Sequence, residues 1–532
     1  MRLQRVAAFK MTAMKKNKNR NSTRLALFAG AAALTALTPQ SRAQSSSDAL
    51  IDKLEQKGIL TAGEARELRA ESAASDTNLI NQLPASKWKL ADSIKSIGLF
   101  GDVRLRYEYR GVDNPTPNAP GSIGGPTSGA TGKTYAWERF RYSLRFGLRG
   151  DLLDDFNYGI RLETSANPRS QFVSFADDTG KSSSSPLSGT PSDKSSDGIN
   201  VGQIYLGWHP SDWFEMTAGK MPMPLYTTPM VWSSGISPEG AFEKFKYSVG
   251  DFDLFADFGQ FDYQDPNPAS AFPSSDTFVT AWQAGGTVKF GKDMSFKIAP
   301  VVYLYTGQGN TTLPGANPNP YTPYNSFVGQ GDVNGLNGAY NQAGINNLLV
   351  LEIPLEFDFK ISNTVLGTLQ ARLFGDVAYN FEGDDRARAA FAAQPAAFPG
   401  LSSAVTGQNK AYQIGFGVGS AGPVYGPTQG LVYGSTSKKN TWEARFYWQH
   451  VEQYALDVNL MDADFFEGRG NLQGFYTAFA YSITDAIIGT VRYGYASQIK
   501  DNLGTGGSNL DIPGINPINN YQLVQLDLTW RF

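Results

Sequence analysis

The feature that most constrains this chain is an alternation of apolar and polar side chains with a period of two. In residues 101–110, Val103, Leu105, Tyr107 and Tyr109 share one face, and five ionic side chains share the other. Because successive side chains of a β-strand point to opposite faces, the pattern predicts an all-β protein. It recurs in residues 139–149, 156–164, 203–209, 252–261, 296–305, 349–360, 369–380, 442–450, 475–481, 487–495 and 524–532.

Two architectures produce this alternation: a soluble sandwich with apolar faces inward, and a membrane barrel with apolar faces toward lipid. Aromatic side chains near strand ends, such as Trp442, Trp448 and Trp530, favour the barrel, because such rings sit at the membrane interfaces. The connections also alternate in length, as in outer-membrane barrels. Short turns are expected at 151–155, 210–212, 249–251, 291–293 and 361–364, and long segments at 111–133, 165–200, 220–240, 262–280, 306–346 and 382–410.

The fold class expected is therefore an all-β transmembrane antiparallel β-barrel of about 16 strands, when weaker segments near 213–219, 241–248, 281–290 and 411–419 are counted. Residues 420–439 are long for a short turn, so 18 strands stay open. An even number of strands places both termini on the periplasmic side. A barrel of this size is expected to enclose an aqueous channel.

The N-terminus reads as a secretory signal peptide over residues 1–43. A basic stretch precedes an apolar run at 25–37, and Ser41-Arg42-Ala43 forms a small-x-small cleavage site. The alternative is a membrane anchor, but a 13-residue helix is too short to cross a bilayer. The start could be Met1 or Met14. Cleavage would remove nine of the 46 basic residues and none of the 49 acidic ones, leaving a formal charge of −12 that disfavours nucleic acid as a partner.

Residues 44–97 are expected to form a periplasmic segment before a barrel domain at 98–532. Helical spacing of apolar residues, Gly58 as a stop and a capping box at Thr61–Glu64 predict a helical hairpin over residues 48–72, followed by a polar linker.

Composition narrows the chemistry that this chain can perform. It has no Cys and two His, so disulfides, Cys-ligated metals and attached c-type haem are excluded, and we expect no cofactor and no metal. No G-x-S-x-G motif occurs, so no catalytic residue is expected and the protein is not predicted to be an enzyme. The pairs Asp177-Asp178 and Asp384-Asp385 are weak calcium candidates.

The signal peptide, a helical prelude with Gly58-Ile-Leu-Thr61 and Glu64-Ala65, and the terminal Leu526–Phe532 segment together resemble the putative porin family of Gram-negative outer membranes. The chain is similar, more loosely, to the general trimeric and the phosphate-selective porins. The resemblance implies a homotrimer in outer-membrane lipid that allows small hydrophilic solutes to diffuse. It also implies that Trp530 and Phe532 form the signal recognised by the outer-membrane assembly machinery.

The inward-facing positions of the strands supply the candidate site. Pore-lining candidates are Arg104, Arg106, Arg139, Arg141, Arg145, Arg149 and Arg161, with Asp102, Glu108 and Glu163 among them and Glu352, Glu356 and Asp358 on another wall. Residues 220–240 correspond to the porin constriction loop, with Lys220, Tyr226, Trp232 and Glu239 as its candidates. In general porins this loop carries opposing acids, whereas here Glu239 is its single acid, so that arrangement is in doubt.

Two interpretations of the arginines remain open. If they are unpaired, the pore should modestly prefer anions. If they pair with acids on other strands, they stiffen the wall. The acids considered for this pairing are Asp253, Asp257, Glu352, Glu356, Asp358, Asp376, Glu443 and Asp527.

Three functions are compatible with the sequence. The first is a diffusion porin, the second a structural or adhesive barrel attached to cell wall or a partner through residues 48–72, and the third a sheath around an electron-transfer protein. Channel conductance would separate the first from the second.

Overall fold

The computed structural model describes residues 91, 93–113, 134–165, 170–175, 198–264, 277–306, 348–393, 401–420, 438–505 and 518–532. The chain divides into two units, residues 1–91 and 92–532, and the following description concerns the second. The signal peptide at 1–43 and the helical hairpin at 48–72 lie outside the described residues and stay predictions. Within the described residues, no helix is long and apolar enough to cross a membrane.

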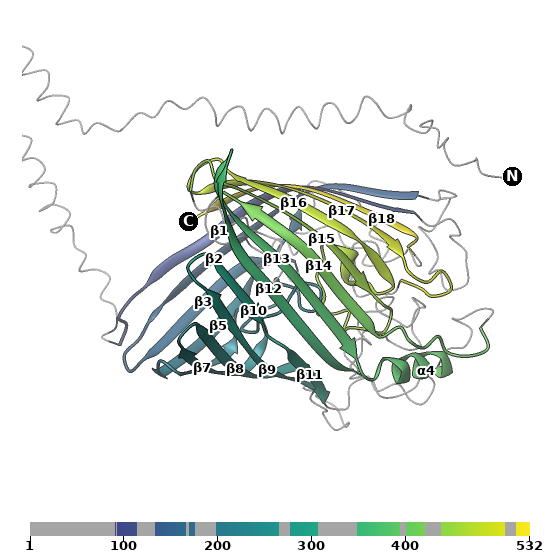
Figure 1. Ribbon diagram of the computed structural model, residues 1–532, viewed down its shortest axis with the longest axis horizontal. Helices are drawn as coiled ribbons and strands as arrows, with labels where there is room; N and C mark the ends of the chain where they lie inside the picture. Colours follow the sequence, from purple (N-terminus) through teal and green to yellow (C-terminus); the bar gives the residue numbers. More distant parts are fainter. Residues whose placement is uncertain are drawn as a thin grey trace, which may run out of the picture. The chain divides into compact units, whose positions relative to one another are not determined.

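The second unit is one antiparallel sheet whose strands are tilted and wrap around a common axis (Figure 1). Its strands are β1 (Gly98–Asp113), β2 (Thr134–Asp151), β3 (Phe156–Thr164), β4 (Val173–Ser174), β5 (Ile199–Ser211), β6 (Phe214–Lys220), β7 (Glu239–Val249), β8 (Phe252–Gln264), β9 (Thr277–Phe290), β10 (Met294–Ile298), β11 (Val301–Thr306), β12 (Leu349–Thr364), β13 (Gly367–Asn380), β14 (Lys410–Gly419), β15 (Trp442–Val451), β16 (Leu472–Ser482), β17 (Ile487–Gln498) and β18 (Asn520–Arg531).

The sheet closes on itself because β1 pairs with both β2 and β18. Val103 lies opposite Trp530, and the Gly101 amide donates to the carbonyl oxygen of Phe532 at 3.0 Å. Two positions in the ring are each occupied by a pair of strands: β10 and β11 both pair with β9 and β12, and β3 and β4 both pair with β2. The 18 strand segments thus occupy 16 strand positions around the ring, and the expected 16-stranded barrel is confirmed.

A proline separates β10 from β11. Pro300 has no amide hydrogen to donate to the ladder, but its carbonyl accepts from the Ala284 amide at 3.1 Å. The Ala299 amide donates to the Pro354 carbonyl of β12, also at 3.1 Å. The single strand predicted at 296–305 therefore occupies one strand position, interrupted between β10 and β11.

Apolar side chains face outward from this barrel and ionic ones face inward. On β1, Arg104 and Arg106 are 1% exposed, whereas Leu105 between them is 39% exposed. On β2, Arg141 is buried and Phe146 is exposed. A soluble sandwich would show the reverse, because its apolar face would form a dry interior.

The connections differ from the prediction in three places. The turn expected at 361–364 lies at Val365 and Leu366, since β12 continues through an irregular pair to Thr364. The segment expected to be a loop at 382–410 contains helix α4 (Gly383–Ala393), which lies beside the ends of β12 and β13 in Figure 1. The segment expected to be a loop at 165–200 contributes β4.

Two loops fold into the barrel and fill part of it. The β6–β7 loop (residues 221–238) contributes Met221, Leu225, Met230, Val231 and Trp232 to an apolar core, and the β15–β16 loop (residues 452–471) contributes Leu456, Val458, Leu460, Met461, Phe465 and Phe466. The loops touch, because the Asp462 amide donates to the Pro229 carbonyl at 3.0 Å. The two loops therefore narrow the space in which the expected aqueous channel can run.

Candidate functional site

A cluster of five arginines lines the inner face where β1, β2, β17 and β18 meet. We call Arg106, Arg110, Arg139, Arg141 and Arg492 the arginine cluster; β18 closes the ring beside β1, which brings Arg492 of β17 near Arg106. Arg106 donates two hydrogen bonds to Asp527, at 2.8 and 2.9 Å. This fork-to-fork geometry holds the guanidinium rigidly.

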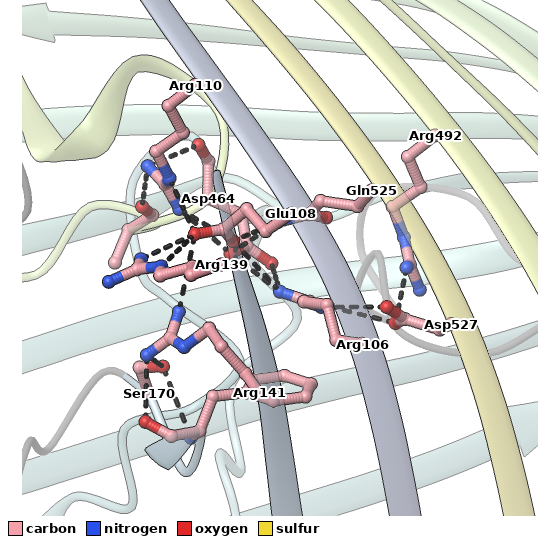
Figure 2. A network of polar contacts seen from close by, with 12 residues as sticks. Arg106, Glu108, Arg110, Arg139, Arg141, Ser170, Asp464, Arg492, Gln525 and Asp527 are labelled. Carbon is pink, nitrogen blue, oxygen red and sulfur yellow. Dashed lines mark hydrogen bonds and ion pairs between the residues drawn. The ribbon is translucent and has the colours of Figure 1, made fainter. Parts of the chain in front are cut away.

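Glu108 is the central acceptor of the arginine cluster, as Figure 2 shows. Its carboxylate accepts from Arg110 at 3.0 Å, from Arg139 at 2.7 Å and from the Gln525 amide at 2.9 Å. The guanidinium of Arg141 lies 3.6 Å from it. Glu108 is fully buried, so these partners replace the hydration that its charge has lost.

The β15–β16 loop brings further acids to the same cluster. Asp464 accepts from Arg106 at 3.1 Å and from Gln525 at 3.0 Å, and Glu467 accepts from Arg110 at 3.0 Å. Burial alone would raise the pKa of the Asp464 carboxyl, but the guanidiniums of Arg106 and Arg110 lower it below its ordinary value. The loop therefore carries an ionised carboxylate into the arginine cluster.

The other predicted arginines of this wall lie nearer the rim that carries the short turns. Asp102 accepts from Arg104 at 2.7 Å and from Arg145 at 2.8 Å. Arg161 donates to Glu163 at 2.8 Å, and both are on β3. Arg149 is exposed, with its guanidinium carbon 5.0 Å from the centre of the Phe100 ring.

The predicted acids on β12 meet other partners. Glu356 and Asp358 both bind Arg372 of β13, at 2.9 and 2.8 Å. Glu352 accepts from the Tyr303 hydroxyl at 2.6 Å and the Thr227 hydroxyl at 2.8 Å. These acids therefore do not balance the arginine cluster across the lumen.

Two threonines anchor the β6–β7 loop to the wall. Besides Thr227, the Thr228 amide donates to Glu352 at 3.1 Å, and the Thr228 hydroxyl donates to Asp376. Both carboxylates are fully buried. The loop is thus bound by hydrogen bonds to two buried carboxyl groups and not by apolar contacts alone.

The four predicted constriction-loop residues are not gathered in one place. Lys220 and Glu239 pair at 2.9 Å where β6 ends and β7 begins, so they close the base of the loop. Trp232 is buried, with its ring 5.8 Å from that of Phe261. The Tyr226 amide donates to the Gln283 side chain at 2.8 Å.

Paired arginines were one of the two interpretations of the sequence, and the pairs are present, but mostly with other acids than those considered. Of those acids, Asp527 binds Arg106 and Arg492 of the arginine cluster. Asp464 and Glu467 were not predicted. A signal existed, because residues 452–471 combine acids with large apolar residues such as Leu456, Phe465 and Phe466.

Inward side chains near the short-turn rim are open to solvent. Lys246 is 45% exposed, Glu215 37% and Lys289 50%, whereas the arginine cluster is buried. A wet chamber at the short-turn rim thus adjoins an interior that the two loops fill.

We predict that replacing Thr227 and Thr228 together with alanine loosens the β6–β7 loop. Each hydroxyl donates to a buried carboxyl group, and a typical hydrogen bond contributes about 0.5–1.5 kcal/mol. Single-channel recordings should show more current noise and a larger mean conductance. The double serine variant keeps both hydroxyls and should behave like the parent. An alanine variant with the current noise and mean conductance of the parent would contradict this anchoring role.

Neither calcium candidate gains support. Asp177-Asp178 lies outside the described residues. Asp385 binds Arg388 at 2.6 Å, and Asp384 accepts from the Gly407 amide at 2.7 Å. Within the described part of the chain, no group of three or more His, Cys, Asp or Glu side chains is placed to hold a metal.

Comparison with known proteins gave three kinds of result. No curated protein matches the chain. Similar solved structures include OprB of Pseudomonas putida, with 10% identity, a TM-score of 0.41, and coverage of 82% of this chain and 94% of that chain. The outer membrane channel DcaP of Acinetobacter baumannii has 13% identity and a TM-score of 0.36, over 84% of this chain and 99% of that one.

The family model described as "Putative porin" matches residues 66–532, which include the whole barrel unit and most of the chain. It agrees with a closed antiparallel barrel that turns apolar side chains outward and ionic ones inward. The chain therefore belongs to the putative porin family and is an outer-membrane β-barrel of the channel type.

Proposed function

We propose that this protein forms a channel through which small hydrophilic solutes and ions diffuse passively across the outer membrane. The observation that carries the proposal is the inner wall of the closed barrel, on which charged side chains replace the apolar ones of the outer face. Such a wall compensates a solute for the hydration it loses on entering a pore. The wet chamber at the short-turn rim supports the same function.

The narrowest part of the path would lie beside the two inward loops. The partly exposed Arg139 and Arg145 would line one side of it and Tyr226 of the β6–β7 loop the other. The buried Arg104, Arg106, Arg141 and Trp232 would support this wall from behind. We further propose a modest preference for anions. Because the arginines of β1 and β2 pair with acids, its support is a cavity near the short-turn rim that is lined by Lys244, Lys246 and Lys297 and by one acid. A reversal potential measured under a KCl gradient tests this: a potential of the sign for chloride is expected, and cation selectivity would overturn it.

The remaining features of the proposal are drawn from the resemblance to porins and from the sequence. They are a cleaved signal peptide at 1–43, a periplasmic segment at 44–97, periplasmic termini, a homotrimer, and recognition of Trp530 and Phe532 by the assembly machinery. In the barrel these two aromatic side chains are about half exposed at the seam between β18 and β1, where a recognition signal would be accessible before closure.

One observation favours a second function. Because the two loops fill part of the interior with apolar side chains, a closed structural barrel that attaches the outer membrane to a partner is the alternative. Liposome swelling separates the two. Vesicles containing the diffusion channel should swell in small sugars at rates that fall with sugar size, whereas vesicles containing a closed barrel should swell no faster than protein-free ones.

A further inference from the structure

A second basic site lies in the barrel, away from the arginine cluster. A cavity of about 420 Å³ opens under the β6–β7 loop, toward the short-turn rim. Three lysines line it: Lys244 and Lys246 from β7, and Lys297 from β10. Apolar and aromatic side chains complete the lining, namely Leu225 and Tyr226 from the loop and Phe255 from β8.

Lys244 and Lys297 each have an ammonium group that makes no short hydrogen bond to a carboxylate. Lys246 binds Glu215 at 2.5 Å, but the nearest carboxylate to Lys244 is that of Asp257 at 3.9 Å, too long for a good hydrogen bond. Among the described residues Lys297 has no ion-pair partner; its ammonium lies 3.5 Å from the centre of the Tyr226 ring.

The one acid that lines the cavity is already engaged. Asp253 binds Lys289 at 2.5 Å and accepts from the Ser248 hydroxyl at 2.7 Å. Three ammonium groups thus face a cavity whose single carboxylate has its own cation. A half-buried ammonium without a carboxylate favours binding of an external anion, because water in a confined site solvates it incompletely.

The rings restrict the kind of anion. The Phe255 ring lies 5.3 Å from the Lys244 ammonium and 5.6 Å from that of Lys297, so aromatic surface and positive charge adjoin. A ligand that contacts both the lysines and the rings would carry an anionic oxygen group on an apolar body. The volume of the cavity suits a small organic molecule. We propose that this cavity is a binding site for small aromatic carboxylates inside the channel, a site that deepens the proposed diffusion function and rests on it for its biological role.

The test is equilibrium binding to the full chain in detergent, which does not require conduction. Benzoate is titrated at low salt. Acetate and phosphate serve as probes without an aromatic ring, and benzyl alcohol as a probe without an anionic group. We expect saturable binding of benzoate that is about tenfold or more tighter than that of the other three. Phosphate binding as tightly as benzoate would overturn the aromatic part of the proposal, and equal binding of benzyl alcohol would overturn the anionic part.

Lys297→Gln is the decisive variant, because it removes the charge and keeps a polar chain of similar length. It should weaken benzoate binding about tenfold or more. Lys360→Gln is the matched control, since Lys360 is an inward lysine of β12 that pairs with Asp293 at 2.7 Å, outside the cavity. Unchanged binding in Lys297→Gln, or equal loss in Lys360→Gln, would overturn the site. A barrel that conducts but does not bind benzoate refutes this inference alone, and one that binds but does not conduct refutes the diffusion function alone.

Discussion

Replacing Glu108 with alanine is expected to destabilise the folded barrel by about 3–5 kcal/mol, the range found when one partner of a buried ion pair is removed. Glu108 is fully buried and binds Arg110, Arg139 and Gln525, with Arg141 close by. Without its carboxylate, several guanidiniums face one another across a few ångströms. The change should appear as a lower urea midpoint for unfolding in lipid vesicles.

A matched control is available on the neighbouring strand. Glu138 of β2 is exposed on the outward side, so its replacement with alanine should change the urea midpoint little. Glu108→Gln keeps two hydrogen-bonding atoms but removes the charge, and should fall between the two. Equal midpoints for Glu108→Ala and Glu138→Ala would show that the arginine cluster does not depend on Glu108.

Shortening the β15–β16 loop should raise the channel conductance at least about twofold, because the current through a pore grows with its open cross-section. Replacing residues 454–468 with a short Gly-Ser linker removes Phe465, Phe466 and their apolar neighbours from the interior. It also removes Asp464 and Glu467 from the arginine cluster, so anion selectivity should rise as conductance rises. Single-channel recording and the reversal potential measure the two effects.

The control is a change in an exposed turn. Replacing Val365 and Leu366, between β12 and β13, with Gly-Ser should leave conductance unchanged, because both side chains are exposed outside the barrel interior. Both variants must first show the gel shift on heating that marks a closed barrel. A shortened β15–β16 loop with unchanged conductance and selectivity would mean that the ion path does not pass this loop.

The strands could be predicted from the sequence because their signal is local. In β1, Val103, Leu105 and Tyr107 alternate with Arg104 and Arg106. The same period of two is present in almost every strand of the barrel. The period shows which side chains face outward, and the number of strands follows from the strand segments counted between the turns. Helix α4 was missed because its sequence, rich in Ala and Arg, lies between Gly and Pro segments that suggest a loop.

The partners of the arginines could not be predicted, because they are determined by contacts between distant parts of the chain. Arg106 and Asp464 are 358 residues apart, and they meet only because β18 closes the ring and the β15–β16 loop turns inward. Thr227 and Glu352 are 125 residues apart and meet in the same way. Strand periodicity determines which side chains face inward, but not which loop fills the space between them.

The filling of the interior was missed for a related reason. The size of a 16-stranded ring indicates an open lumen, and residues 220–240 were expected to narrow it as a constriction loop. Met230, Val231 and Trp232 belong to the same apolar cluster as Phe465 and Phe466 of the other loop. The contribution of the β15–β16 loop to this cluster could not be predicted from the strand pattern.

The most direct test of a diffusion channel is the conductance of the purified, folded protein in a planar lipid bilayer. The ionic inner wall predicts discrete current steps at constant voltage, whose size grows nearly in proportion to KCl concentration and changes little with the sign of the voltage. A barrel that shifts on heated gels, inserts into the bilayer and gives no steps above the detergent control at any salt concentration would contradict it.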